Sequence, residues 1–257
     1  MKIKGKTILI TGGASGIGLE AAKQFSELEA RVIITGRNQL KLDEAKNLHP
    51  QLIAIKSDVA NATDAGLLFD RVKELGGIDI LYNNAAVLVT PSNLGIPNDK
   101  HAQGAAYEME VNYLGVIRLN NLFMAMLQSR KEAAIINTTS ILSQAPSLIE
   151  ATYSSSKTAL AFYTVSLREH LKIIGSKIKI VELIPPLVAT DMTQERSDKK
   201  ISVEEMVNSF IDGLQKGHQT IRVGDAKPFN LINRFFPKIG FKIINPKKSH
   251  QLLKELN

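Results

Sequence analysis

The segment from Thr11 to Gly18 constrains the fold of this chain more than any other feature. It reads Thr-Gly-Gly-Ala-Ser-Gly-Ile-Gly and joins the apolar run 7–10 to a helical pattern over 16–29. A strand that turns into a helix within so few residues needs backbone angles that glycine adopts at little cost, and the helix N-terminus then offers unpaired N–H groups to a phosphate. This context predicts a dinucleotide-binding site, with an ordinary turn of small residues as the alternative. The expected contacts are Gly12, Ala14, Ser15, Gly16, Ile17 and Gly18.

Apolar runs alternate with helical patterns along the whole chain. Strands are expected near 6–11, 31–35, 51–56, 78–82, 133–139, 177–184 and 220–223. Helices are expected over 16–29, 38–48, 63–75, 104–130 and 152–174. Most of the strands are continuous apolar runs, which is typical of strands covered on both faces. The alternation predicts an α/β fold, a doubly wound parallel sheet of about seven strands in a three-layer α/β/α sandwich of the Rossmann type.

No linker, repeat or low-complexity segment interrupts residues 1–257, so we expect a single Rossmann-type domain. Two stretches are longer than a crossover requires, 86–103 and a substrate-loop region over about 186–218. Long loops at the carboxyl edge of such a sheet form substrate sites. Met192, Met206 and Val203 suggest that the second stretch supplies a partly apolar wall, but neither stretch identifies the substrate.

The composition excludes several classes of function. The chain contains no cysteine, which leaves no disulfide framework, no thiolate nucleophile and no cysteine-ligated metal site, and we expect no metal. The apolar run 7–10 is too short for a signal peptide, and no window approaches the roughly 18 apolar residues of a membrane span. These features predict a soluble cytoplasmic protein.

A second pattern, Tyr153-Ser-Ser-Ser-Lys157, places a phenol and an ammonium on one face of an expected helix. A phenol with its ordinary pKa of about 10 is a poor base at neutral pH, and a nearby positive charge lowers that pKa. Such a pair supplies the acid and base that the interconversion of a carbonyl and an alcohol needs. A surface pair near the helix N-terminus is the alternative.

Two more polar residues stand where a catalytic set needs them. Ser140 follows the strand expected at 133–139, and a side chain at the carboxyl end of a strand projects toward a bound cofactor. It can donate a hydrogen bond to a substrate carbonyl, and a plain polar strand exit is the alternative. Asn112 interrupts the helical segment 104–130, either as a functional residue or as a buried polar residue satisfied within the helix.

Five motifs occur along the chain in a fixed order. They are Thr11-Gly12-x-x-x-Gly16-x-Gly18, Asp58-Val59, Asn83-Asn84-Ala85, the set Asn112, Ser140, Tyr153 and Lys157, and the stretch from Pro185 to Thr190. Over roughly residues 5–190 the chain therefore resembles the short-chain dehydrogenase/reductase superfamily, in its single-domain branch. Pro185-Pro186 before Thr190, together with Arg222-Val223-Gly224, also resembles the DltE-like oxidoreductases associated with lipoteichoic-acid D-alanylation operons.

The resemblance implies a role for each of these residues. Tyr153 is expected to be the catalytic acid and base, with Lys157 lowering its pKa and holding the nicotinamide ribose. Ser140 is expected to orient the carbonyl, and Asn112 to support a water-linked proton relay. The other implied cofactor contacts are Asp58 at the adenine, Asn84 beside the nicotinamide ribose, Thr190 at the carboxamide or phosphates, and Val59, Ala85, Ala86, Pro185 and Val188.

Two departures from the family pattern concern the nicotinamide end of the expected site. The usual Asn-Asn-Ala-Gly ends here in Ala86, and the usual Pro-Gly before the threonine is replaced by Pro185-Pro186. Ala86 adds a methyl group near the cofactor, while Pro186 removes an N–H and stiffens the start of the substrate loop. The catalytic set is intact, so activity is expected.

The end of the second strand indicates which cofactor is bound. An acidic residue there binds the ribose 2′-hydroxyl of NAD, whereas this chain has Gly36-Arg37-Asn38. No carboxylate repels a 2′-phosphate, and Arg37 offers a planar, permanently charged partner for one. NADP(H) is therefore the predicted cofactor. NAD(H) is the alternative if Arg37 is an ordinary surface residue at a helix start.

The net charge of +7 is concentrated near the C-terminus, where we expect a basic C-terminal extension over about 225–257. Residues 227–248 hold four of the nine phenylalanines, interleaved with basic residues, and no nucleic-acid recognition motif accompanies them. Such a segment can be an amphipathic membrane-surface element, a lid for an anionic or lipid-like substrate, or an element packed on the core or on a neighbouring subunit. Packing is favoured, because Pro237, Gly240 and Pro246 interrupt any long amphipathic helix.

The predicted function is that of an NADP(H)-dependent oxidoreductase that transfers a hydride between nicotinamide and a small-molecule carbonyl or secondary alcohol. A non-catalytic NADP(H)-binding sensor or scaffold is one alternative, and sugar-nucleotide epimerisation on the same fold is another. In the family, helices matching 104–130 and 152–174 commonly pair across a two-fold axis. The resemblance therefore implies a homodimer or a homotetramer.

Overall fold

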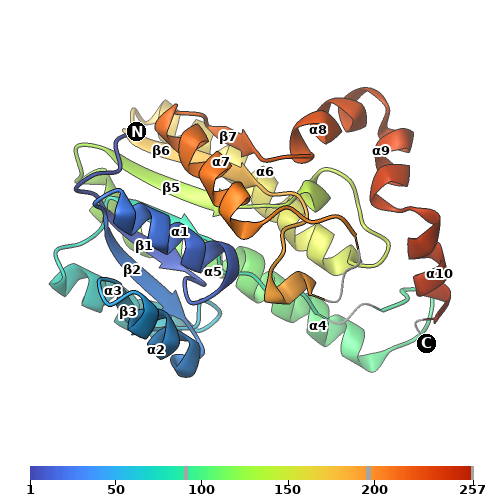
Figure 1. The fold of residues 1–257 in the computed structure, drawn as a ribbon, viewed down its shortest axis with the longest axis horizontal. Coiled ribbons are helices and arrows are strands. Elements are labelled where there is room, and N and C mark those ends of the chain that lie inside the picture. The colour runs from blue at the N-terminus through green and yellow to red at the C-terminus, as the bar shows by residue number, and fades with distance from the viewer. Residues whose placement is uncertain (90–91, 195–197, 256–257) are drawn as a thin grey trace.

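A parallel sheet forms the centre of the computed structural model, which describes residues 1–89, 92–194 and 198–255 (Figure 1). Its seven strands are β1 Thr7–Thr11, β2 Arg31–Gly36, β3 Ile53–Lys56, β4 Ile80–Asn83, β5 Ala133–Thr138, β6 Ile178–Ile184 and β7 Thr220–Arg222. They lie in the order β3-β2-β1-β4-β5-β6-β7, and every neighbouring pair is parallel. The predicted doubly wound Rossmann fold is confirmed.

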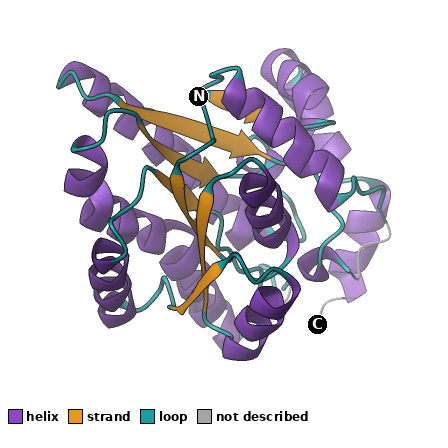
Figure 2. Ribbon diagram, turned by 60° about the vertical axis from the view of Figure 1, so that its left-hand side comes forward, coloured by secondary structure: helices purple, strands orange, loops and turns teal. Residues whose placement is uncertain are grey.

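Helices cover both faces of this sheet (Figure 2). One face carries α1 Gly16–Glu27, α2 Gln39–Leu48 and α7 Val203–Gln215, and the other carries α3 Ala62–Glu74, α5 Gly115–Gln128 and α6 Ala151–Ile173. In β1, Ile8 and Ile10 pack into the first layer and Leu9 into the second, because successive side chains of a strand point to opposite faces. Burial on both faces accounts for the continuous apolar runs in the sequence.

The segment expected as one helix over 104–130 is divided at its middle. It consists of α4 Asp99–Met109, a π-helical turn at Glu110–Leu114, and α5. Asn112 lies within the π-helical turn and is fully buried. Such turns insert one extra residue into a helix and are frequent at functional sites, so the interruption expected at Asn112 is confirmed.

The second half of the expected substrate-loop region is a helix, which corrects the prediction for 186–218. Ser202 caps the N-terminus of α7, since its Oγ accepts a hydrogen bond from the Glu205 N–H at 3.0 Å. Met206, which belongs to α7, is fully buried in the core, so the expectation that it forms a substrate wall is wrong. Val203, at the start of α7, packs against the same core. The pattern Ser-x-x-Glu before an apolar run is a known helix-start signature that was present in the sequence.

Three short helices at the end of the chain form a C-terminal arm, defined here as residues 226–255. They are α8 Ala226–Phe235, α9 Pro237–Ile244 and α10 Lys247–Glu255. The arm follows one side of the molecule from β7 toward α4 (Figure 1). Pro237 and Pro246 divide it as expected, whereas Gly240, the third expected break, lies inside α9. Asn93 Nδ2 donates a hydrogen bond to the Leu253 carbonyl at 3.0 Å, which fastens the last helix to the loop before α4.

Candidate active site

A cavity of about 1120 Å³ lies at the carboxyl ends of the central strands. Its walls come from the segments that follow β1, β2, β4, β5 and β6, from the start of α6, and from the C-terminal arm. The strand order reverses between β1 and β4. A doubly wound sheet binds its ligand at this reversal, because the two chain segments diverge there and leave a crevice.

The structure brings nearly all of the predicted site residues to this one cavity. Those that line it are Gly12, Ala14, Ser15, Gly16, Ile17, Arg37, Asp58, Val59, Asn84, Ala85, Ala86, Ser140, Tyr153, Lys157, Pro185, Val188 and Thr190. Gly18 and Asn112 are not among its lining residues. Both act on the cavity through the elements that they hold together.

The glycine turn after β1 is dense and presents backbone to the cavity. Gly12 and Gly16 have φ angles of +63° and +51°, in the left-handed region that favours glycine. A Cβ on Gly18 would collide with the Gly12 carbonyl, so this third glycine lets α1 start directly against the turn. The first turn of α1 holds no acidic residue, and the Ser15 side chain makes no capping bond to it. Its N–H groups and positive dipole end therefore suit a pyrophosphate.

Asn84 braces this turn from the end of β4. Its Nδ2 donates hydrogen bonds to the carbonyls of Thr11 at 3.0 Å and Gly12 at 3.3 Å. In return, Thr11 Oγ1 accepts from the N–H groups of Asn84 and Ala85, both at 3.0 Å. The side chain predicted to lie beside the nicotinamide ribose thus fastens the end of β4 to the glycine turn after β1.

Positive side chains gather at the end of β2. Arg37 is exposed on the cavity wall, with its Cζ 5.7 Å from the centre of the Tyr107 ring. Asn38 caps α2 by accepting a hydrogen bond from the Lys41 N–H at 3.2 Å. Lys41 lines the same wall and forms an ion pair with Asp191 at 3.0 Å. Lys41 was not among the predicted cofactor contacts, although its position four residues after Arg37 indicates that the two side chains lie close together.

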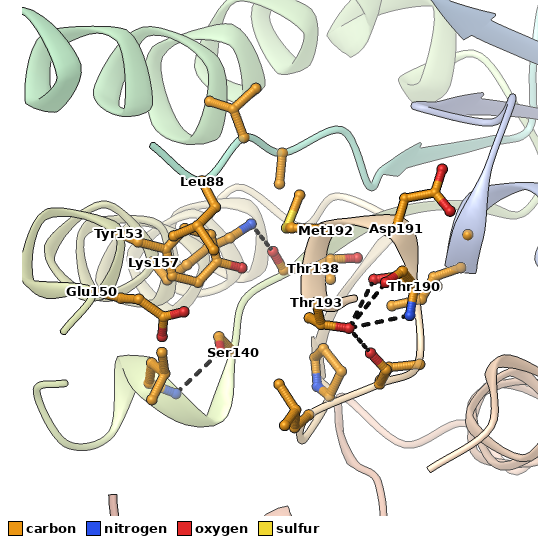
Figure 3. A pocket seen from close by; sticks show the side chains of 18 of the residues that line it. Leu88, Thr138, Ser140, Glu150, Tyr153, Lys157, Thr190, Asp191, Met192 and Thr193 are labelled. Carbon is orange, nitrogen blue, oxygen red and sulfur yellow. Dashed lines mark hydrogen bonds between the residues drawn. The ribbon is translucent and has the colours of Figure 1, made fainter. Parts of the chain in front are cut away.

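Tyr153 and Lys157 lie one turn apart on α6 and both reach the cavity (Figure 3). Lys157 Nζ donates a hydrogen bond to the Thr138 carbonyl at 2.9 Å and lies 5.7 Å from the centre of the Tyr153 ring. Burial lowers the pKa of Lys157 to about 8. Burial also raises the pKa of Tyr153, and the negative charges of Glu150 and Glu108 add to the rise. The expectation was a lowered tyrosine pKa, but the pKa is raised, because desolvation of the phenolate dominates.

Ser140 lies at the end of β5, on the side of the cavity that also holds Tyr153 and Glu150 (Figure 3). Its Oγ accepts a hydrogen bond from the Leu142 N–H at 3.1 Å and so caps the short 3₁₀-helix Ile141–Ser143. A hydroxyl that accepts one bond keeps its own O–H as a donor. Ser140 therefore caps the short helix after β5 and can also donate a hydrogen bond to a carbonyl oxygen.

Asn112 ties the segment after β4 to α6. Its Oδ1 accepts from the Val87 N–H at 2.8 Å, and its Nδ2 donates to the Val87 carbonyl at 2.9 Å and to Ser156 Oγ at 3.1 Å. The partners are thus on two other elements rather than within its own helix, as one alternative had it. These bonds hold the helix that carries Tyr153 and Lys157 against the edge of the cavity.

The C-terminal arm forms part of the cavity wall. Residues from its second half line the cavity, namely Ile243, Ile244, Pro246, Lys248, Ser249 and Leu252. Its first half packs on the core through Phe229, which is buried. Of the possibilities expected for residues 227–248, packing on the core was favoured, and the first half of the arm does so. The second half lies at the cavity, where the alternative, a substrate lid, would lie. Met192 lies on the same cavity wall, as expected.

Known proteins match most of the chain. Residues 6–201 match the family model for short chain dehydrogenases. The uncharacterized oxidoreductase DltE of Bacillus subtilis (strain 168) is 35% identical over 228 residues, which cover 86% of this chain and 89% of the relative. An NADP-dependent 3-hydroxy acid dehydrogenase of Schizosaccharomyces pombe is 29% identical over 202 residues, or 76% of each chain. The crystal structure of a short chain dehydrogenase from Burkholderia cenocepacia J2315 in complex with NADP matches with a TM-score of 0.84 and 25% identity, over 95% of this chain and 99% of that one.

Proposed function

Because the chain belongs to the short-chain dehydrogenase family of oxidoreductases, we propose that it is an NADP(H)-dependent enzyme acting on a carbonyl or a secondary alcohol. The observation that carries the proposal is one cavity that holds a glycine turn at a helix N-terminus together with Ser140, Tyr153 and Lys157. The turn fits the phosphates of a dinucleotide, and the three side chains fit the proton chemistry of a carbonyl. NADP bound to the Burkholderia relative supports the same use of this cavity.

The chemistry assigns a separate task to each side chain. When bound, the nicotinamide supplies a hydride to the carbonyl carbon or accepts one from the alcohol carbon. Ser140 donates a hydrogen bond to the substrate oxygen and orients it toward Tyr153. Tyr153 gives its phenolic proton to that oxygen during reduction and takes a proton back during oxidation. Its raised pKa suits the reducing direction, because the phenol stays protonated at neutral pH.

Lys157 supports the tyrosine in this scheme. Below its pKa of about 8 the buried ammonium is positively charged. A positive charge this close stabilises the phenolate that remains after Tyr153 has given up its proton. Screening the oxidation of NADPH against aldehydes, ketones, quinones and sugars tests the function directly. Retained NADPH binding with no turnover across that panel would instead favour a sensor or scaffold.

The choice of NADP(H) rests on two positive side chains and on a missing carboxylate. Arg37 and Lys41 line the cavity just after β2, where an NAD-binding protein would place an acidic residue. A guanidinium binds a phosphate through two parallel hydrogen bonds, and Lys41 adds a second positive charge nearby. A 2′-phosphate would compete with Asp191 for Lys41, since that carboxylate now pairs with it.

Replacing Arg37 by alanine is expected to weaken NADPH binding by about 10- to 100-fold, the cost of losing charge-assisted hydrogen bonds to a phosphate. The affinity for NADH should change little, because NADH carries no 2′-phosphate. Fluorescence titration of both cofactors measures the two dissociation constants. Arg71→Ala, an exposed arginine on α3, is the matched control. Wild-type protein that prefers NADH, or an equal loss for both cofactors in Arg37→Ala, would contradict the assignment.

We also propose that the chain forms a dimer or tetramer through α5 and α6. Phe162 on α6 is 72% exposed and Val165, one turn further, is 49% exposed, and such apolar side chains on a long helix are typical of an interface. Light scattering at micromolar concentration should give a mass of at least two chains. Phe162→Glu should shift that mass toward one chain. Leu67→Glu, at an exposed apolar residue on α3, is the control and should not change the mass. A wild-type mass of one chain would refute the proposal.

A further inference from the structure

The C-terminal arm carries an unbalanced positive charge. Its residues, 226–255, contain seven lysine or arginine residues and a single acidic residue, Glu255, so that the arm carries six of the seven net positive charges. All seven side chains are exposed: Lys227, Arg234, Lys238, Lys242, Lys247, Lys248 and Lys254. A field of one sign on one side of a molecule attracts a surface of the opposite sign.

The same arm exposes large apolar side chains between those charges. Phe235 and Phe236, at the junction of α8 and α9, are 67% and 60% exposed. Leu231 lies one turn before Phe235 on α8, and Ile239 and Ile243 lie one turn apart on α9. Leu231, Ile239 and Ile243 are each about half exposed or more. Residues four apart share a face of a helix. Both helices therefore offer an apolar face edged by basic side chains.

We propose that this arm docks on the surface of an anionic lipid bilayer. Basic side chains interleaved with aromatic and aliphatic ones are what an interfacial helix needs, because the apolar groups enter the boundary of headgroups and acyl chains while the cations meet the phosphates. Each lysine or arginine near such a surface adds to the binding. None of the helices in the described ranges is long and apolar enough to cross a membrane, so the contact is a surface contact.

A second copy of this chain is a poorer occupant of the same face. A two-fold interface places the same patch on both sides, and here that would set one strongly positive arm against another. The residues outside the arm carry a net charge of +1, which does not offset this repulsion. A bilayer rich in anionic lipid instead neutralises all seven charges.

Docking would also place one wall of the substrate cavity at the lipid surface. On α9, Ile239 and Ile243 are exposed, and Ile243 and Ile244 line the cavity, so Ile243 belongs to both surfaces. Leu252 on α10 lines it as well. The arm is thus shared between the docking face and the cavity.

The absence of tryptophan from the chain allows a direct test. Phe235→Trp introduces a single tryptophan on the docking face, and its emission should shift to the blue on addition of phosphatidylcholine vesicles containing about 30% phosphatidylglycerol. Vesicles of phosphatidylcholine alone should cause no shift. Phe162→Trp, on α6 and also exposed, should show no shift with either vesicle. An equal shift with neutral vesicles, or none with anionic ones, would overturn the proposal.

Co-sedimentation of the unlabelled full-length protein with the same vesicles gives a second measurement. Lys238→Glu/Lys242→Glu should weaken binding at least about tenfold, since each reversal replaces attraction by repulsion, and salt of about 0.5 M should weaken the wild type similarly. Lys46→Glu/Lys177→Glu changes the net charge equally outside the arm and should bind nearly as wild type. Equal loss in both double variants would overturn the proposal. A third outcome would also overturn the proposal: the protein does not bind vesicles, and Phe236→Ser dissociates a dimer. That result would identify the face as a subunit interface.

Discussion

Replacing Tyr153 by phenylalanine is expected to lower kcat for carbonyl reduction by about 10³-fold, the usual worth of a positioned general acid. The substitution removes only the phenolic hydroxyl, and the ring stays in place on the cavity wall. Cofactor binding should be retained, because the glycine turn and Arg37 are untouched. Steady-state turnover with the best substrate of the screen, together with an NADPH titration of the same variant, measures both quantities.

A second tyrosine on the same helix provides the control for this experiment. Tyr163 lies ten residues further along α6, and its hydroxyl accepts a hydrogen bond from Asn120 Nδ2 at 3.5 Å. Tyr163→Phe removes the same chemical group from the same element and should keep turnover within a few-fold of wild type. Unchanged turnover in Tyr153→Phe, or an equal loss in Tyr163→Phe, would contradict the role assigned to Tyr153.

Replacing Lys157 by methionine is expected to make the protein more stable and nearly inactive. Lys157 is 1% exposed, and burial lowers its pKa from the ordinary value of 10.5 to about 8. A lowering of this size means that the buried charge destabilises the folded wild type by about 3 kcal/mol. Loss of the hydrogen bond to Thr138 destabilises the variant by about 1 kcal/mol. Methionine has a similar length and no charge, so the free energy of unfolding at pH 7 should rise by about 2 kcal/mol.

The pH dependence of this gain separates desolvation from other causes. Below pH 8 Lys157 is charged in both the folded and the unfolded chain, so the difference between the variant and the wild type should stay constant. Between about pH 8 and 10.5 the folded wild type has released the proton while the unfolded chain keeps it, so wild-type stability rises with pH. The advantage of Lys157→Met should therefore shrink over this interval.

Urea unfolding at several pH values measures these free energies. Lys177→Met, at an exposed lysine just after α6, is the control and should show neither the gain nor its loss at high pH. A Lys157→Met variant that is less stable than the wild type at pH 7 would contradict the desolvation argument. Turnover of Lys157→Met should fall because the positive charge beside Tyr153 is lost. Buried charges in active sites often support activity while lowering stability.

Much of the site was predictable because its signals are local in the chain. The glycine turn, the pair of residues four apart on a helix, and the residues at strand ends follow from backbone geometry and from the rule that parallel strands end at one edge. Even α7, which was expected as a loop, carried a readable start signal in Ser202 and Glu205. The structure gathered these separate signals into one cavity.

Other properties depend on residues that are far apart in the sequence. Asn112 bonds to Val87, 25 residues away, and to Ser156, 44 residues away, and no local pattern names such partners. The end of the arm reaches Asn93, 160 residues before Leu253. Its role as a cavity wall therefore emerged only once the chain was folded.

By itself, the sequence determined the fold, the position of the glycine turn and the side chains that are proposed to react. Each of these depends on hydrophobic period, on backbone freedom or on residue type, which are properties of short stretches. Only the tertiary structure decided the protonation of the pair on α6, because the pKa values of Tyr153 and Lys157 depend on how deeply the folded protein buries them. It also decided that the second half of the C-terminal arm lines the cavity, because that contact joins residues far apart in the chain.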